Sequence, residues 1–202
     1  MTALRHNGRL DRLDPGRHPT VGAALEACLH ADGEEHVLVA VHVDGRAIDE
    51  SEFPELYELA SDGVAKIDVI SRPLRGVAID ALESAADYAP GLAAALARAA
   101  GLLRAGESGR AVALWAEACE ALEMLLHALA VVGAALTEAR DLPAATAIAL
   151  RAPLAAAVAA HERGDLLALA DLLDYELAAR VEALAGRLRA LHTAGAAAAA
   201  EG

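Results

Sequence analysis

The feature that most constrains the fold is a change in sequence character near Arg72-Pro73. Before this point, short alternating segments are separated by turn residues, as in a small β domain. After it, the chain is rich in alanine and leucine almost to its end, and its apolar residues recur with helical spacing. We therefore predict an α+β protein with a small β-rich domain over residues 1–72, a mainly antiparallel α-helical bundle over 73–194 and a flexible tail over 195–202.

Turn signals divide the first part of the chain into short elements. The dipeptides Asn7-Gly8 and Asp44-Gly45 favour tight hairpin turns, because their residues tolerate a positive φ. A short helix is expected over 21–29, with Thr20 as its N-cap. Valines alternate with other residues over 37–43, which predicts a strand, and a last strand is expected over 64–71.

This order of hairpin, helix, hairpin and final strand resembles a β-grasp domain of the ubiquitin-like kind, and more closely the small sulfur-carrier proteins of thiamine and molybdopterin biosynthesis. The matching stretches are RHNGR, TVGAALEACL, VAVHVDGRAI and VAKIDVI. The resemblance covers the first third of the chain and implies a β-grasp fold there. Sulfur carriers act through a free C-terminal Gly-Gly, whereas here SRPLRGVAID follows the last strand with a single glycine, Gly76. An atypical sulfur-carrier-like protein stays an alternative only if a protease exposes a new terminus.

The second part predicts four helical segments joined by short connections, which favours an up-and-down bundle. The segments are Leu74–Arg104, Gly109–Arg140, Leu142–Arg163 and Asp165–His192. Pro90 and Pro153 fall inside two of them, and each predicts a kink or a break, because proline removes a backbone donor and clashes with the preceding turn. Breaks there would give six helices. One stretch, LLRAGESGRAVALWAEACEAL, also looks like a single tetratricopeptide hairpin, but a solenoid needs several repeats.

Charge limits the classes of partner. The chain has a formal net charge of −13, and both parts are acidic: residues 1–72 hold 7 basic and 14 acidic residues (−7), and the remaining residues hold 10 and 16 (−6). We expect no nucleic-acid partner and no membrane partner, because both usually require a basic face. Cys28 and Cys119 are interpreted as buried thiols of a reducing compartment, and a disulfide would require the two parts to touch there. The N-terminus lacks an export signal, so a cytoplasmic location is expected.

The stretch 128–136 is apolar on every side of its predicted helix. It is too short to span a bilayer. A helix without a polar face must be buried all round, and a four-helix monomer does not easily achieve this. We therefore expect a homodimer that forms through the helices.

Two groups of polar residues are candidates for a site, one on each of two predicted helices. Asp171, Asp174 and Glu176 form an acidic patch that could serve recognition or bind a metal, although a helix surface explains it more simply. Glu120, Glu123 and His127 share one side of a predicted helix and are weak candidates for a metal site, since helical bundles bind metals through carboxylates and histidines. The simpler interpretation is a solvated face, so no metal and no cofactor is predicted. No nucleophile or phosphate-binding motif is present, so no catalytic residue is predicted and the chain is not expected to be an enzyme.

The function predicted from these observations is that of a non-enzymatic cytoplasmic interaction or adaptor protein. A small-ligand or metal-binding helical bundle is the alternative. The residues expected to contact a protein partner lie in ESEFPELYEL and in the acidic stretch ADLLDYEL. They are Phe53, Tyr57, Asp171, Asp174 and Glu176.

Overall fold

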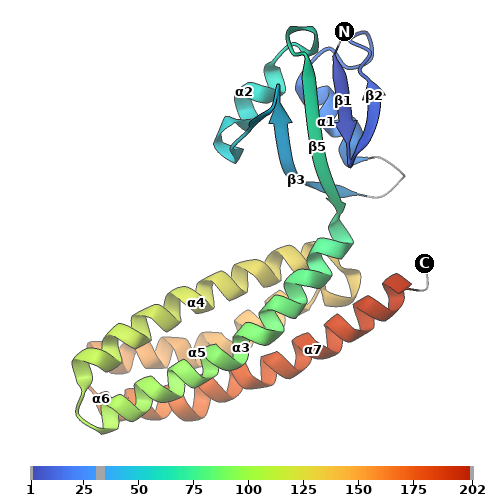
Figure 1. Cartoon of the computed structure of the whole chain (residues 1–202). Coiled ribbons are helices and arrows are strands. Elements are labelled where there is room, and N and C mark those ends of the chain that lie inside the picture. The colour runs from blue at the N-terminus through green and yellow to red at the C-terminus, as the bar shows by residue number, and fades with distance from the viewer. Residues whose placement is uncertain (1, 31–34, 201–202) are drawn as a thin grey trace. The chain divides into compact units, whose positions relative to one another are not determined.

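The computed structural model describes residues 2–30 and 35–200. It is an α+β protein whose chain divides into two compact units, Met1–Val77 and Ala78–Gly202. The first unit is a mixed β-sheet with short helices, and the second is a bundle of long helices (Figure 1). Each unit has its own hydrophobic core.

Five strands form the sheet of the first unit in the order β2-β1-β5-β3-β4. They are β1 Ala3–His6, β2 Arg9–Arg12, β3 His36–Val43, β4 Arg46–Ala47 and β5 Lys66–Pro73. The central pair, β1 and β5, is parallel, and the other three pairs are antiparallel. A parallel pair requires a crossover connection, and the helix α1 (Val21–Leu29) lies within it.

The local signals in the first unit act as expected. Asn7 and Asp44 adopt positive φ values of 48° and 51°, and a glycine follows each of them in its hairpin turn. The side chain of Thr20 accepts a hydrogen bond from the backbone of Ala23 and so caps α1. Apolar residues of α1 pack on one face of the sheet. The buried residues of this core are Val21, Leu25, Cys28, Val41, Leu56, Val64, Ile67 and Val69.

The second unit is built from helices whose apolar stripes meet in one core (Figure 1). They are α3 Leu74–Arg104, α4 Ser108–Ala135, α5 Leu142–Glu162, α6 Leu166–Asp171 and α7 Ala179–Ala200, with a π-helical segment Leu172–Ala178 between the last two. The core residues are mostly leucine and alanine, which lets the helices approach closely. Gly133 of α4 shows this closeness, because a Cβ placed on it would lie 2.6 Å from Cγ of Pro143 in α5.

The structure bears on three expectations for the bundle. Pro90 and Pro153 lie inside the continuous helices α3 and α5, which excludes a break at either proline and leaves the kink. Of the tail predicted over 195–202, residues 195–200 continue α7 as helix, and 201–202 lie outside the described residues. Within 128–136, Leu129, Val132, Gly133 and Leu136 are buried in the bundle itself, so one chain covers much of this stretch without a partner.

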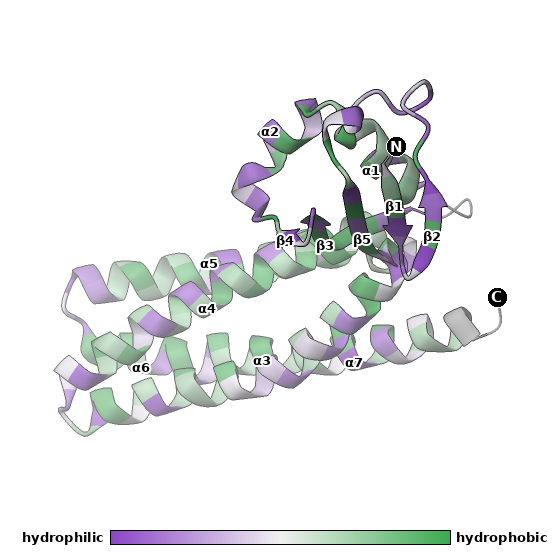
Figure 2. Cartoon of the chain, turned by 45° about the horizontal axis from the view of Figure 1, so that its top comes forward, coloured by the Kyte–Doolittle hydropathy of each residue, from purple (hydrophilic) through white to green (hydrophobic). Residues whose placement is uncertain are grey.

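By length and composition alone, α4 and the segment Thr137–Glu162 are each long and apolar enough to cross a membrane. Core helices of soluble proteins satisfy the same criterion, so this observation is weak evidence for a membrane. Hydrophobic residues predominate along the helices of the bundle, as Figure 2 shows.

Candidate functional site: a groove between two helices

A hollow surface of the bundle lies between α3 and α4. Gly106, with φ of +80°, ends α3 and turns the chain into α4, so the two helices form an antiparallel hairpin. Three hollows of about 620, 210 and 430 Å³ follow one another along this hairpin and share residues where they meet. We call them together the α3–α4 groove. It extends along α3 from Ala81 to Leu102, which is about 30 Å at the rise of an α-helix.

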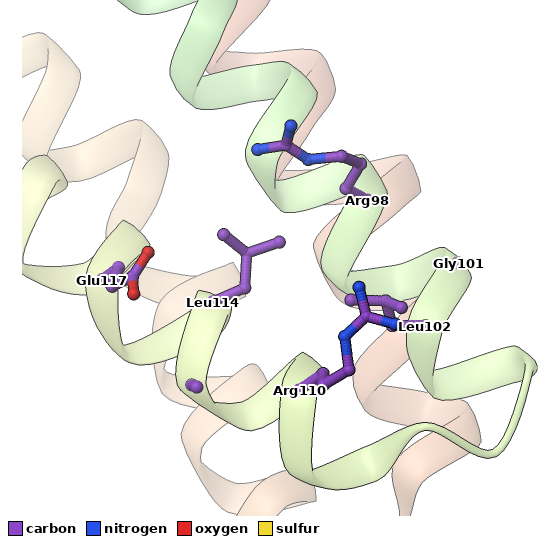
Figure 3. A pocket seen from close by; sticks show the side chains of 7 residues that line it. Arg98, Gly101, Leu102, Arg110, Leu114 and Glu117 are labelled. Atoms are coloured by element: carbon purple, nitrogen blue, oxygen red, sulfur yellow. The ribbon is translucent and has the colours of Figure 1, made fainter.

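The end of the groove near the hairpin turn carries charge (Figure 3). Arg98 comes from α3, and Arg110 and Glu117 come from α4. Leu114 points into the space between the two helices, and Leu102 faces it from α3 (Figure 3). Arg110 forms an ion pair with Glu107 three residues earlier. This end can therefore contact both a charged and an apolar group.

The opposite end of the groove is apolar. It is lined by Tyr88 and Ser84 of α3 and by Met124 and Leu125 of α4, with alanines between them. The side chain of Met124 is 72% exposed, and Tyr88 and Val131 are each 51% exposed. Val131 follows Met124 by seven residues, so it lies on the same side of α4. Large apolar side chains therefore stand at the edge of an apolar hollow, which is typical of a docking surface.

Small residues widen the middle of the groove. On α3, a Cβ placed on Gly91 or on Gly101 would meet nothing within 4 Å. Ala95 lines the same stretch, opposite Ala118 and Ala121 of α4. The middle of the groove is therefore lined largely by glycine and alanine.

The acidic stretch ADLLDYEL is already paired within the bundle. The guanidinium of Arg104, at the end of α3, donates to Asp171 Oδ1 at 2.9 Å and to Asp174 Oδ2 at 2.7 Å. It also lies over the ring of Tyr175, 5.3 Å from the ring centre. The hydrogen bonds to Asp171 and Asp174 raise the pKa of Arg104. These contacts link the end of α3 to the end of α6 and to the π-helical segment, so both aspartates already have a partner within the bundle.

Glu176 is paired as well. Its carboxylate accepts a hydrogen bond from Arg180, one turn later in the chain. The sequence spacing of four residues made this pair predictable. The π-helical segment that carries Asp174 and Glu176 was not predicted, because the sequence continues its helical periodicity through it.

The candidate metal residues do not form a site. Glu120, Glu123 and His127 are all exposed on α4. In the part of the chain that the structure describes, no group of three or more His, Cys, Asp or Glu side chains is arranged to hold a metal ion.

Phe53 and Tyr57 are not free surface residues. Both lie in the helix α2 (Phe53–Glu58), where they are half-buried and pack against the core of the first unit. The ring of Tyr57 comes so close to α1 that a Cβ on Gly22 would lie 2.6 Å from its Cδ1. The sequence pattern could not show this, because the contact joins segments that are distant in the chain.

A polar cluster that the sequence did not indicate lies around Ser71 in β5. The hydroxyl oxygen of Ser71 is 2.7 Å from Nε2 of His6 and 3.0 Å from Nδ1 of His36. The backbone N–H of Ser71 donates to Oδ1 of Asn7 at 2.9 Å. Ser71 is only 5% exposed, so its hydroxyl links β1, β5 and β3 and is closed to a substrate in this conformation.

A cavity of about 490 Å³ lies beside this cluster, between the first hairpin and α1. His6, Arg9, His18 and Cys28 are among its lining residues. Burial raises the pKa of the Cys28 thiol to about 11, so this thiol is protonated at neutral pH. A protonated thiol is a poor nucleophile, which is consistent with a packing role for Cys28.

The fold and the groove together define a two-unit α+β protein whose helical bundle carries an open groove between α3 and α4. Residues 80–186 match the family described as Domain of unknown function (DUF8042). The match covers more than half of the chain, so the chain belongs to this family. The matched residues include the whole α3–α4 groove. No curated protein and no solved structure matches the chain.

Proposed function

We propose that this chain is a non-enzymatic interaction protein of the cytoplasm that docks other protein surfaces through the α3–α4 groove. The observation that carries the proposal is the groove itself, which is open, lined by small residues and edged by the exposed Tyr88 and Met124. Such a groove suits a helix of a partner protein. Helices pack by placing the ridge of side chains on one helix into the groove between the ridges of another. The acidic residues of ADLLDYEL are less suited, since Arg104 already neutralises two of them.

We also propose that the first unit is a β-grasp domain that presents a second surface to a partner. The strand order β2-β1-β5-β3-β4, with a parallel central pair and a helix in the crossover, supports this assignment. In this chain β5 continues through Pro73 into α3, and Gly76 lies inside that helix. The proposed role is therefore binding, without a sulfur-carrying terminus. Nuclear Overhauser contacts between Ala3 and Lys66 in the full chain would test the parallel pairing.

A comparison of two substitutions in the native host tests the docking function. Tagged wild-type chain, Met124→Glu and Ile148→Glu are captured, and the proteins recovered with each are quantified by mass spectrometry. Met124 edges the groove, whereas Ile148 is an equally exposed apolar residue on α5. We expect Met124→Glu to lose the stoichiometric partners, an untagged copy of the same chain included, and Ile148→Glu to retain them. Equal recovery with all three chains would contradict the proposal.

A further inference from the structure

We propose that the partner of the α3–α4 groove is the same groove of a second copy, packed face to face and antiparallel. This inference rests on the proposed docking function and names the occupant. The groove face of the α3–α4 hairpin has both projecting side chains and an open hollow. The projections of one copy can therefore fit the hollow of another. A self-complementary patch is what a two-fold symmetric dimer requires.

The projections are Tyr88 on α3 and Met124 and Val131 on α4. They are the exposed large apolar residues of α3 and α4 in the described part of the chain. The hollow beside them is floored by alanine and by Gly91. When two such faces meet, the projections of each copy occupy the open space of the other, and both lose apolar surface to water.

Charge favours the antiparallel arrangement. Arg98 lies at the turn end of the groove, and Glu83 and Asp87 lie on α3 toward its other end. All three side chains are exposed, and no ion pair to them is found within the described ranges 2–30 and 35–200. A parallel dimer would bring arginines near arginines and carboxylates near carboxylates. An antiparallel dimer brings Arg98 of each copy to the carboxylates of the other.

The middle of the groove sets the register. Along α3 the groove runs from Ala81 to Leu102, so its midpoint falls at Gly91 and Leu92. A two-fold axis at Gly91 places residue 98 of one copy opposite residue 84 of the other. Glu83 and Asp87 flank residue 84, so this register places Arg98 of one copy beside the carboxylates of the other. Gly91 has no side chain, so the two α3 helices can approach closely where they cross.

The apolar half of the groove supplies apolar surface that two copies can bury. Each chain carries a net charge of −13, and two copies repel each other at long range. The hollow between Ala81 and Ala128 has no charged lining residue, and the antiparallel arrangement places it opposite the turn end of the other copy, where Arg98, Arg110 and Glu117 lie. The charged ends of these side chains must therefore pair across the interface or stay in water at its edge.

Charge reversal and rescue test the inference. Sedimentation equilibrium of the full chain is measured for wild type, Arg98→Glu, Glu83→Arg/Asp87→Arg and the triple variant. We expect a wild-type dimer, about tenfold weaker dimerisation in each reversed variant, and recovery to within a few-fold in the triple variant. The control is Arg151→Glu, which makes the same change of charge on an exposed residue of α5 and is expected to leave the dimer unchanged.

Three results would overturn the inference: a wild-type monomer at every concentration, equal weakening by Arg151→Glu, or no recovery in the triple variant. Circular dichroism confirms that each variant is folded. A monomeric wild type would contradict self-docking. If the same wild type captures other proteins and Met124→Glu does not, the proposed docking function is still supported.

Discussion

Replacing Gly133 with alanine is expected to destabilise the bundle, although alanine is the better helix former. A Cβ at Gly133 would lie 2.6 Å from Cγ and 2.9 Å from Cδ of Pro143, whereas carbon atoms in contact prefer a separation of about 3.5–4.0 Å. The proline ring is rigid and sits at the start of α5, so α4 and α5 must move apart. Overpacking of this kind costs about 1–3 kcal/mol. The higher helix propensity of alanine offsets about 1 kcal/mol of this cost.

Gly186 of α7 is the matched control, because a Cβ placed on it would meet nothing within 4 Å. Gly186→Ala should therefore stabilise the bundle by about 1 kcal/mol, and the two variants should differ by about 1–3 kcal/mol. Urea unfolding is followed through Trp115, the only tryptophan of the chain, which is buried in the bundle and reports on that unit alone. If Gly133→Ala gains as much stability as Gly186→Ala, the close packing of α4 on α5 is wrong.

Three further substitutions or treatments test separate features. Thr146→Val should raise the stability of the bundle by about 1–3 kcal/mol, because Thr146 is 3% exposed and its hydroxyl has no partner within the described residues; an unchanged or lower urea midpoint would refute this. Gly22→Ala should destabilise the first unit, because the new Cβ would collide with Tyr57; amide exchange that is unchanged in β3 and β5 would count against that contact. Alkylation of Cys28 should be slow at pH 8, where about one thiol in a thousand is ionised, and its rate should rise about tenfold per pH unit toward the pKa of about 11. Intact-protein and peptide masses measure the labelling, and fast labelling without pH dependence would contradict burial of the thiol.

Local signals made much of the fold predictable. The two hairpin turns, the cap at Thr20 and the helix over 21–29 each depend on a few neighbouring residues, and the structure confirms them. The α+β class follows from the change of periodicity near residue 72. Of the kink or break expected at Pro90 and Pro153, the break does not occur, because the helix packs on both sides of each proline and this offsets the loss of one backbone hydrogen bond.

The candidate site was less predictable, because its features depend on contacts between distant segments. Arg104 pairs with Asp171 and Asp174 across 67 and 70 residues of sequence. The cluster at Ser71 joins residues up to 65 positions apart. The α3–α4 groove could have been suspected from Gly91 and Ala95, which repeat small residues at helical spacing. The sequence cannot show which side of a small-residue helix the bundle leaves open.

Disulfide cross-linking at the middle of the groove directly tests whether two copies dock through the α3–α4 groove. Gly91→Cys is introduced into a chain in which Cys28 and Cys119 are replaced by alanine, and Ile148→Cys in the same background is the control on α5. Oxidation of Gly91→Cys should give a covalent dimer with twice the 20.7 kDa mass of the chain, whereas Ile148→Cys should stay monomeric. A monomer from Gly91→Cys, or equally fast cross-linking through Ile148→Cys, would contradict self-docking of two copies through the α3–α4 groove.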